Sequence, residues 1–201
     1  MAKLFWFDSE LRFLEKQMQE PPGYRPRGCG ICIGESAWKS HDDYMEIVDY
    51  VINRMQMEQL KVRVGEIFCG EEKEESVFRN AMHRENFRTL LTKQMGNAFW
   101  HSPNYAAAVF LLSADEKLWQ LISGNIADTG IYFDRVKLGG VTLEEYILFH
   151  AARDAYSGTR HIRVSELADR ELIPDDILRL IIHAFVIGKC GVEIVKRGGA
   201  E

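Results

Sequence analysis

Signals that begin and end α-helices recur at short intervals from residue 77 to residue 191 of this chain. Ser102-Pro103 has the pattern of a helix N-cap followed by proline at the first helical position. Gly158 lies just beyond one run of helical periodicity, Ser165 is placed to cap a single turn, and Pro174 opens a long run that stops near Gly191. Since each signal acts within a few residues, this part of the chain is predicted to be mainly helical.

Two capping-box patterns locate further helix starts. In a capping box, a Ser or Thr side chain and a Glu three residues later each accept a hydrogen bond from a backbone N–H group at the helix start. Ser113 with Glu116 predicts a short helix, and Thr142 with Glu145 predicts a longer one. Between them, residues 131–138 are rich in β-branched and aromatic side chains, which predicts a short strand.

The first third of the chain follows a different pattern. Gly30–Gly34 has the composition of a short strand, and Ser40 opens an amphipathic helix that is predicted to run to about Leu60. Lys61–Phe68 then alternates polar and apolar residues with period two, as a half-buried strand does. These segments predict a small strand-helix-strand unit, which a right-handed parallel crossover would connect.

The charged run Cys69–Glu75 separates the two patterns and marks the predicted domain boundary. The predicted fold class is α+β, with a small N-terminal α/β region at residues 1–72, a mostly helical domain at 73–197 and a tail at 198–201. The chain is 46% hydrophobic and 27% charged, as soluble globular proteins are. No apolar run approaches the roughly 18 residues of a membrane span, and the N-terminus has no targeting pattern, so we expect a cytoplasmic protein without a membrane partner.

The net charge of −5 is concentrated in the first third of the chain. Residues 1–75 carry 10 Lys and Arg against 15 Asp and Glu, whereas the remaining residues carry 15 of each. Phosphate neutralisation requires clustered Lys and Arg, so this acidic segment argues against nucleic-acid binding there. An electrostatically attracted partner would instead be basic.

The only C-x-x-C motif, Cys29 to Cys32, has three interpretations. It could supply two ligands of a zinc site, with Cys69 at the end of the second predicted strand and His41 at the start of the intervening helix as further ligands. It could be a redox dithiol, although such motifs normally open a helix, where the thiol pKa falls. Because the motif lies in an apolar run and no second C-x-x-C exists, we favour structural thiols and no cofactor.

A second candidate site combines basic and acidic residues around one predicted helix end. His150 and Asp154 lie four residues apart on that helix, and the basic residues nearby are Arg153, Arg160, His161 and Arg163. This set could contact an anion such as phosphate, or assist acid-base chemistry. Cations also favour helix C-termini without any ligand, so a solvated helix end is the simpler interpretation. A nucleic-acid contact here is a further alternative.

Known catalytic motifs are absent from the sequence. It has no G-x-S-x-G nucleophile elbow, no G-x-x-x-x-G-K-S/T phosphate loop and no G-x-G-x-x-G dinucleotide fingerprint. His183 lies in the most apolar predicted helix, where a buried histidine is a more common role than a ligand. These absences favour a protein that is not an enzyme.

Four stretches carry a resemblance to a known family. They read M-H-R-E-N-F-R-T-L-L, Y-A-A-A-V-F-L-L-S-A-D, A-A-R-D-A-Y-S-G-T-R-H-I-R-V-S-E-L-A-D and D-D-I-L-R-L-I-I-H-A-F-V-I-G-K. With these, residues 78–195 resemble a family of small uncharacterised proteins, a domain of unknown function, from Gram-positive bacteria and their mobile elements. The resemblance implies a compact, mostly helical domain and no particular chemistry. Its association with mobile elements implies a protein that contacts a host or defence factor.

We therefore expect a non-enzymatic protein that binds another protein. Phe5, Trp6 and Phe7 are the candidate apolar anchors of its acidic N-terminal region, because large aromatic side chains dominate binding energy at interfaces. The first alternative is a zinc-binding module or metal-dependent enzyme that uses the cysteines. The second is a nucleic-acid contact through the arginines near the predicted helix end.

Overall fold

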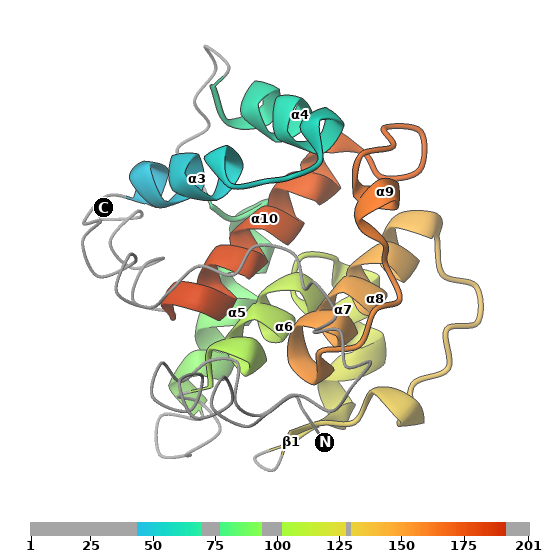
Figure 1. Ribbon diagram of the computed structural model, residues 1–201. Helices are drawn as coiled ribbons and strands as arrows, with labels where there is room; N and C mark the ends of the chain where they lie inside the picture. The colour runs from blue at the N-terminus through green and yellow to red at the C-terminus, as the bar shows by residue number, and fades with distance from the viewer. Residues whose placement is uncertain (1–43, 70–76, 94–101, 128–129, 192–201) are drawn as a thin grey trace, which may run out of the picture. The chain divides into compact units, whose positions relative to one another are not determined.

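A computed structural model describes residues 44–69, 77–93, 102–127 and 130–191 (Figure 1). The chain divides into two compact units, residues 1–56 and 57–201. The first unit is described only by helix α3 (Tyr44–Asn53) and the residues that follow it. In α3, Ile47, Val48 and Val51 are buried while Glu46 and Asp49 are exposed, as the amphipathic pattern predicts. The helix ends earlier than the predicted Leu60.

The predicted strand at residues 61–68 is wrong, because these residues belong to helix α4 (Glu58–Cys69). Leu60, Val64 and Phe68 are buried at intervals of four residues, while Val62 is 52% exposed. The alternation of Val62 with Val64 was therefore accidental, and the helical spacing that starts at Leu60 decides the structure. With 61–68 helical, the predicted strand-helix-strand unit does not form, although its first strand lies outside the described residues.

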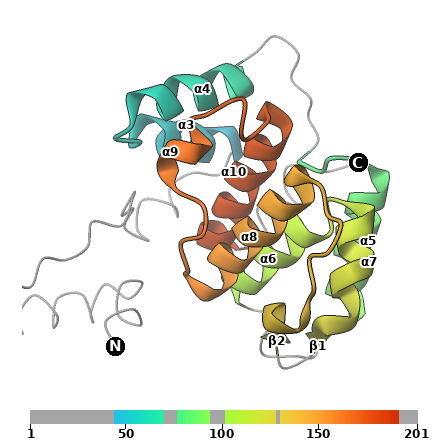
Figure 2. The same cartoon turned by 90° about the vertical axis from the view of Figure 1, so that its right-hand side faces the viewer.

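The second unit is built around a central buried helix, α6 (Pro103–Leu112), in which every residue from Tyr105 to Leu112 is buried. Helices α8 (Leu143–Ser157) and α10 (Asp175–Cys190) pack on α6 most extensively (Figures 1 and 2). The other helices of this unit are α5 (Ala81–Lys93), α7 (Glu116–Ile122) and the single-turn α9 (Val164–Leu167). The described part of the chain is thus mostly helical, which confirms the prediction for the C-terminal region.

Local signals placed several helix ends correctly. Pro103 begins α6 after Ser102, and Pro174 immediately precedes α10, which stops at Gly191. Thr142 and Glu145 form the predicted capping box: Thr142 Oγ1 accepts from Glu145 N at 3.2 Å, and Glu145 Oε2 accepts from Thr142 N at 2.8 Å. These interactions involve neighbours in sequence, so they need no tertiary information.

Two predicted caps differ from the structure. The N-cap of α7 is Asp115, whose carboxylate accepts from Leu118 N at 2.9 Å, whereas Ser113 is buried and its hydroxyl donates to Phe110 O at 3.1 Å. Helix α9 begins at Val164, so Ser165 lies inside the turn it was predicted to cap. At α7, Ser113 and Asp115 could each cap the helix, and the burial of Ser113 leaves Asp115 as the cap; the N-cap of α9 is Arg163.

The predicted strand at 131–138 is reduced to part of a two-stranded antiparallel hairpin. Strands β1 (Ile126–Ala127) and β2 (Gly130–Ile131) pair, with Ile126 opposite Ile131. A short 3-10 turn, Phe133–Arg135, follows β2. This hairpin is the only sheet within the described residues, and none of the helices described there is long and apolar enough to cross a membrane.

We expect Gly130→Ala to destabilise the protein by roughly 1 to 3 kcal/mol, because Gly130 has a φ of 139° and an added Cβ would lie 2.4 Å from the Tyr156 hydroxyl oxygen. Thermal denaturation of the variant would measure the loss. The companion Tyr156→Phe change removes that oxygen, so the double variant should regain part of the stability. Equal stability of Gly130→Ala and the parent protein would contradict the argument.

Candidate functional site

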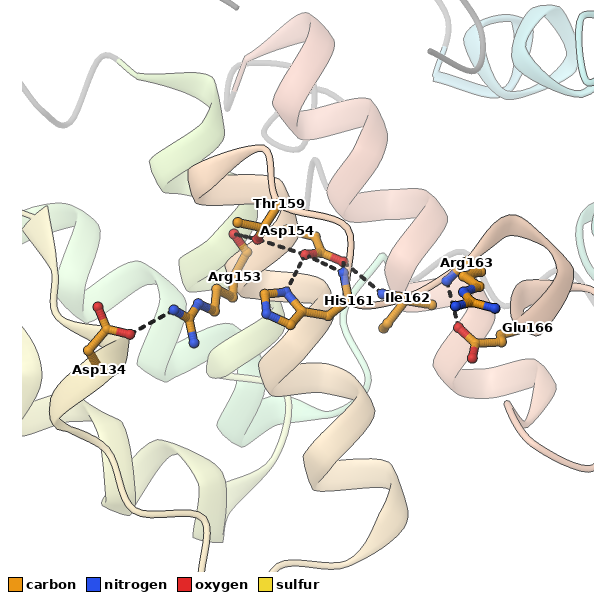
Figure 3. Close-up of polar contacts among 8 residues, drawn as sticks. All are labelled: Asp134, Arg153, Asp154, Thr159, His161, Ile162, Arg163 and Glu166. Atoms are coloured by element: carbon orange, nitrogen blue, oxygen red, sulfur yellow. Dashed lines mark hydrogen bonds and ion pairs between the residues drawn. The ribbon is translucent and has the colours of Figure 1, made fainter. Parts of the chain in front are cut away.

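The basic and acidic cluster expected near one helix end lies at the C-terminal turns of α8 and in the connection to α9 (Figure 3). Gly158 ends α8 in the left-handed conformation, with a φ of 63°, and turns the chain back along the helix. This reversal brings Thr159, His161 and Ile162 to the carboxylate of Asp154. Asp154 and His161, which are seven positions apart in sequence, therefore become direct partners.

Asp154 is the centre of this cluster. Its carboxylate accepts hydrogen bonds from the backbone N–H groups of His161 at 2.8 Å and Ile162 at 3.0 Å, and from the Thr159 hydroxyl at 2.8 Å. It also lies 2.7 Å from His161 Nδ1. Burial alone would raise the pKa of Asp154, but these hydrogen bonds outweigh it and lower the pKa below its ordinary value. Asp154 therefore fixes the α8–α9 connection as a charged carboxylate.

A ladder of three rings runs along the same side of α8. The ring centroids of Tyr146 and His150 are 4.2 Å apart, and those of His150 and His161 are 4.7 Å apart. Burial, the neighbouring His161 and Arg153 lower the pKa of His150, against the opposing effect of Asp154. The Nδ1 atom of His150 is buried and has no hydrogen-bond partner among the described residues.

The Asp154–His161 pair has the geometry of an oriented general base. With Nδ1 of His161 donating to Asp154, its Nε2 atom is left as the proton acceptor. However, His150, Asp154 and His161 line neither of the two cavities best formed by the described residues. Neither of these two cavities would therefore hold a small substrate against the cluster.

Carboxylates lie close to three of the four candidate anion-contact residues. Arg153 pairs with Asp134 at 2.7 Å, and His161 is bonded to Asp154. The backbone N–H of Arg163 donates to the Glu166 carboxylate at 2.6 Å, and Arg160 is exposed. The negative charges of these carboxylates weaken the attraction of this surface for phosphate.

An exposed apolar face of α8 was not anticipated from the sequence. Leu143 is 53% exposed and Tyr146 is 48% exposed, and they lie three residues apart on one side of the helix. Together with His150 and His161 they form what we call the α8 strip, defined by Leu143, Tyr146, His150 and His161. Figure 2 presents α8 to the viewer. The signal in the sequence was that apolar residues from 143 to 152 occupy more than one face of the predicted helix.

A cavity of about 520 Å³ is lined by residues of α4, of the segment that precedes α5 and of α10. Two ion pairs lie within its lining: Arg170 pairs with Glu66, and Arg79 pairs with Asp176 at 2.9 Å. His183 also lines it and is buried, as predicted. With three arginines and three carboxylates in its lining, the cavity has no evident preference for a charged ligand.

The residues of the zinc and N-terminal hypotheses fall mainly outside the described part of the chain. Cys29, Cys32 and His41 lie there, as do the aromatic residues at positions 5–7. Cys69 ends helix α4 and not a strand, so the argument that strand pairing brings it to Cys29 and Cys32 no longer holds. Within the described residues, no group of three His, Cys, Asp or Glu side chains could hold a metal ion.

Comparisons with protein families, with curated proteins and with solved structures found no match to this chain. The resemblance of residues 78–195 to a family of uncharacterised proteins therefore stays a prediction. A function for this chain therefore has to be inferred from the chemistry of its side chains.

Proposed function

We propose that this protein acts by binding another protein and not by catalysing a reaction, with the α8 strip as one binding surface. The observation that carries the proposal is the exposure of Leu143 and Tyr146, which lie side by side on a helix whose opposite face fills the core. Side chains that become fully buried at the centre of an interface, with tyrosine prominent among them, supply much of its affinity. An apolar or aromatic surface on the partner would fit them.

The remaining site chemistry supports binding over catalysis. Asp154 is committed to hydrogen bonds that hold the α8–α9 connection, and Arg153 is engaged by Asp134. A mobile-element protein that contacts a host or defence factor, as the family resemblance implies, would fit this proposal. Phe5, Trp6 and Phe7 remain a second candidate contact.

The alternatives remain open to experiment. Zinc binding through Cys29 and Cys32 would appear as near-stoichiometric metal in the purified protein that is lost in Cys29→Ser. Nucleic-acid contact through Arg153, Arg160 and Arg163 would appear as salt-dependent binding that weakens when any of them becomes Glu. The mixed charge of that surface favours a protein partner.

We expect Tyr146→Ser to lower partner affinity at least tenfold while leaving the melting temperature nearly unchanged, because the side chain is half exposed in the free protein. A photo-crosslinking residue at position 146, introduced in producing cells, would identify the partner. Its binding to purified parent and variant proteins would then be measured by calorimetry.

The matched control is Glu171→Ser, which changes an exposed side chain outside the α8 strip. It should leave both crosslinking and affinity unchanged. If no protein crosslinks at position 146, or if an identified partner binds Tyr146→Ser as tightly as the parent, the α8 strip is not the binding surface.

A further inference from the structure

We infer that His150, His161 and Asp154 form an acid-sensitive latch that holds the α8–α9 connection against α8 at neutral pH and releases it as the pH falls. The latch is closed by the four hydrogen bonds to Asp154 described above, which Figure 3 shows. The contact between the imidazole rings of His150 and His161 adds to them. His161 takes part in both, because its ring bonds Asp154 and contacts His150.

The two histidines respond differently to a proton because of what each faces. A proton added to His161 faces the Asp154 carboxylate, 2.7 Å from Nδ1, so the bond between them becomes an ion pair. A proton added to His150 faces the His161 ring 4.7 Å away, and Arg153 adds a positive charge on the same helix. Two imidazolium rings at this separation repel each other.

The other charged and titratable groups around His150 and His161 do not remove the repulsion between the two protonated rings. Tyr146 contacts His150 through its ring, and the carboxylate of Asp134 is engaged by Arg153. Arg160 and Arg163, on the connection itself, add positive charge. Asp154 partly offsets the repulsion, but its carboxylate is already bonded to His161. Opening the connection separates the rings and lets His150 take up its proton.

The direction of the pH effect follows from proton linkage. The pKa of His150 is lowered in the closed latch and returns towards its ordinary value of 6.5 when the connection opens, so the open state binds more protons. Acid therefore favours opening, beginning as the pH falls through about 6.5. With one linked proton, the opening equilibrium increases by up to about fivefold between pH 6.5 and 5.5, because His150 of the open state is already half protonated at pH 6.5.

Hydrogen exchange measured by NMR tests the latch. The amides of His161 and Ile162 donate to Asp154, so after correction for the intrinsic rate their protection should fall by up to about fivefold from pH 6.5 to 5.5. The buried Ser113 amide, which donates to Val109 O in the core, reports global unfolding, so the effect of acid on the stability of the whole unit is measured separately from the opening of the latch.

His150→Phe is the decisive variant, because it keeps a ring at this position and removes the titrating group. Its two reporter amides should stay protected at pH 5.5. Protection that is independent of pH in the parent protein, or an identical pH dependence in His150→Phe, would overturn the inference. Any effect of latch opening on partner binding rests on the proposed function. The exchange experiment needs no partner, so it tests the latch independently of that function.

Discussion

Replacement of Arg63 by Met should lower the free energy of unfolding by about 2 to 4 kcal/mol, because it removes a buried guanidinium that bonds two backbone carbonyl groups and a half-exposed carboxylate. Arg63 is 2% exposed, and its guanidinium donates to the Asp175 carboxylate at 2.8 Å, to Leu167 O at 2.7 Å and to Ile173 O. Met fills much of the same volume but donates no hydrogen bond, so two carbonyl groups and a carboxylate lose their partner. Urea denaturation at neutral pH would measure the change.

The matched control for this prediction is Arg170→Met. Arg170 pairs with Glu66, but their side chains are 56% and 57% exposed, so the loss should stay below about 1 kcal/mol. Arg63→Lys should give an intermediate loss, because one ammonium group cannot reproduce the planar fork of the guanidinium. Equal losses for Arg63→Met and Arg170→Met would mean that the buried network does not stabilise the unit.

The second large effect is a loss of stability in weak acid, caused by two buried histidines. Burial is the main cause that lowers the pKa of His83 to about 4 and of His183 to about 3, with Arg79 and Arg179 respectively adding to the shift. His83 accepts from the backbone N–H of Arg79 at Nδ1, 3.1 Å, and its Nε2 lies 2.8 Å from Phe110 O. These two contacts assign the proton to Nε2, so both nitrogen atoms of the neutral ring have a hydrogen-bond partner.

Because both pKa values lie below the unfolded value of about 6.5, the unfolded chain binds more protons as the pH falls. Stability is therefore complete above pH 6.5 and should decline by about 3 to 4 kcal/mol between pH 6.5 and pH 5, at up to 1.4 kcal/mol per histidine and pH unit. His150 contributes with the same sign. Urea midpoints measured between pH 7.5 and 5 would follow this decline.

His83→Gln and His183→Gln are each expected to remove roughly half of the pH dependence, whatever their stability at pH 7.5, because each removes one of two linked protons. The slope of the free energy of unfolding against pH is therefore the quantity to compare. A general loss of stability lowers that free energy at every pH without changing the slope. A parent protein whose urea midpoint is constant from pH 7.5 to 5 would show that these histidines do not govern its acid stability.

Particular residues show why parts of the site could be predicted. His150, Asp154 and His161 could be grouped from sequence because they belong to one helix end and the turn after it. That Asp154 would bind the turn, and that Arg153 would be occupied by Asp134, depended on how the chain reverses at Gly158 and where the Phe133–Arg135 turn packs. The exposure of Tyr146 depended on which face of α8 meets α6.

Three helix ends follow from signals in the neighbouring sequence: the Thr142–Glu145 capping box, the glycine stop at Gly158 and the proline start at Pro174. The helical state of residues 61–68 depends on tertiary packing, because their short alternating pattern suits a strand equally well, whereas burial of Leu60 and Val64 with Val62 exposed requires a helix. Tertiary packing also decides the role of Arg63, whose three partners lie more than 100 residues away in the chain. Local patterns fix local hydrogen bonds, whereas burial is a property of distant neighbours that no short segment specifies.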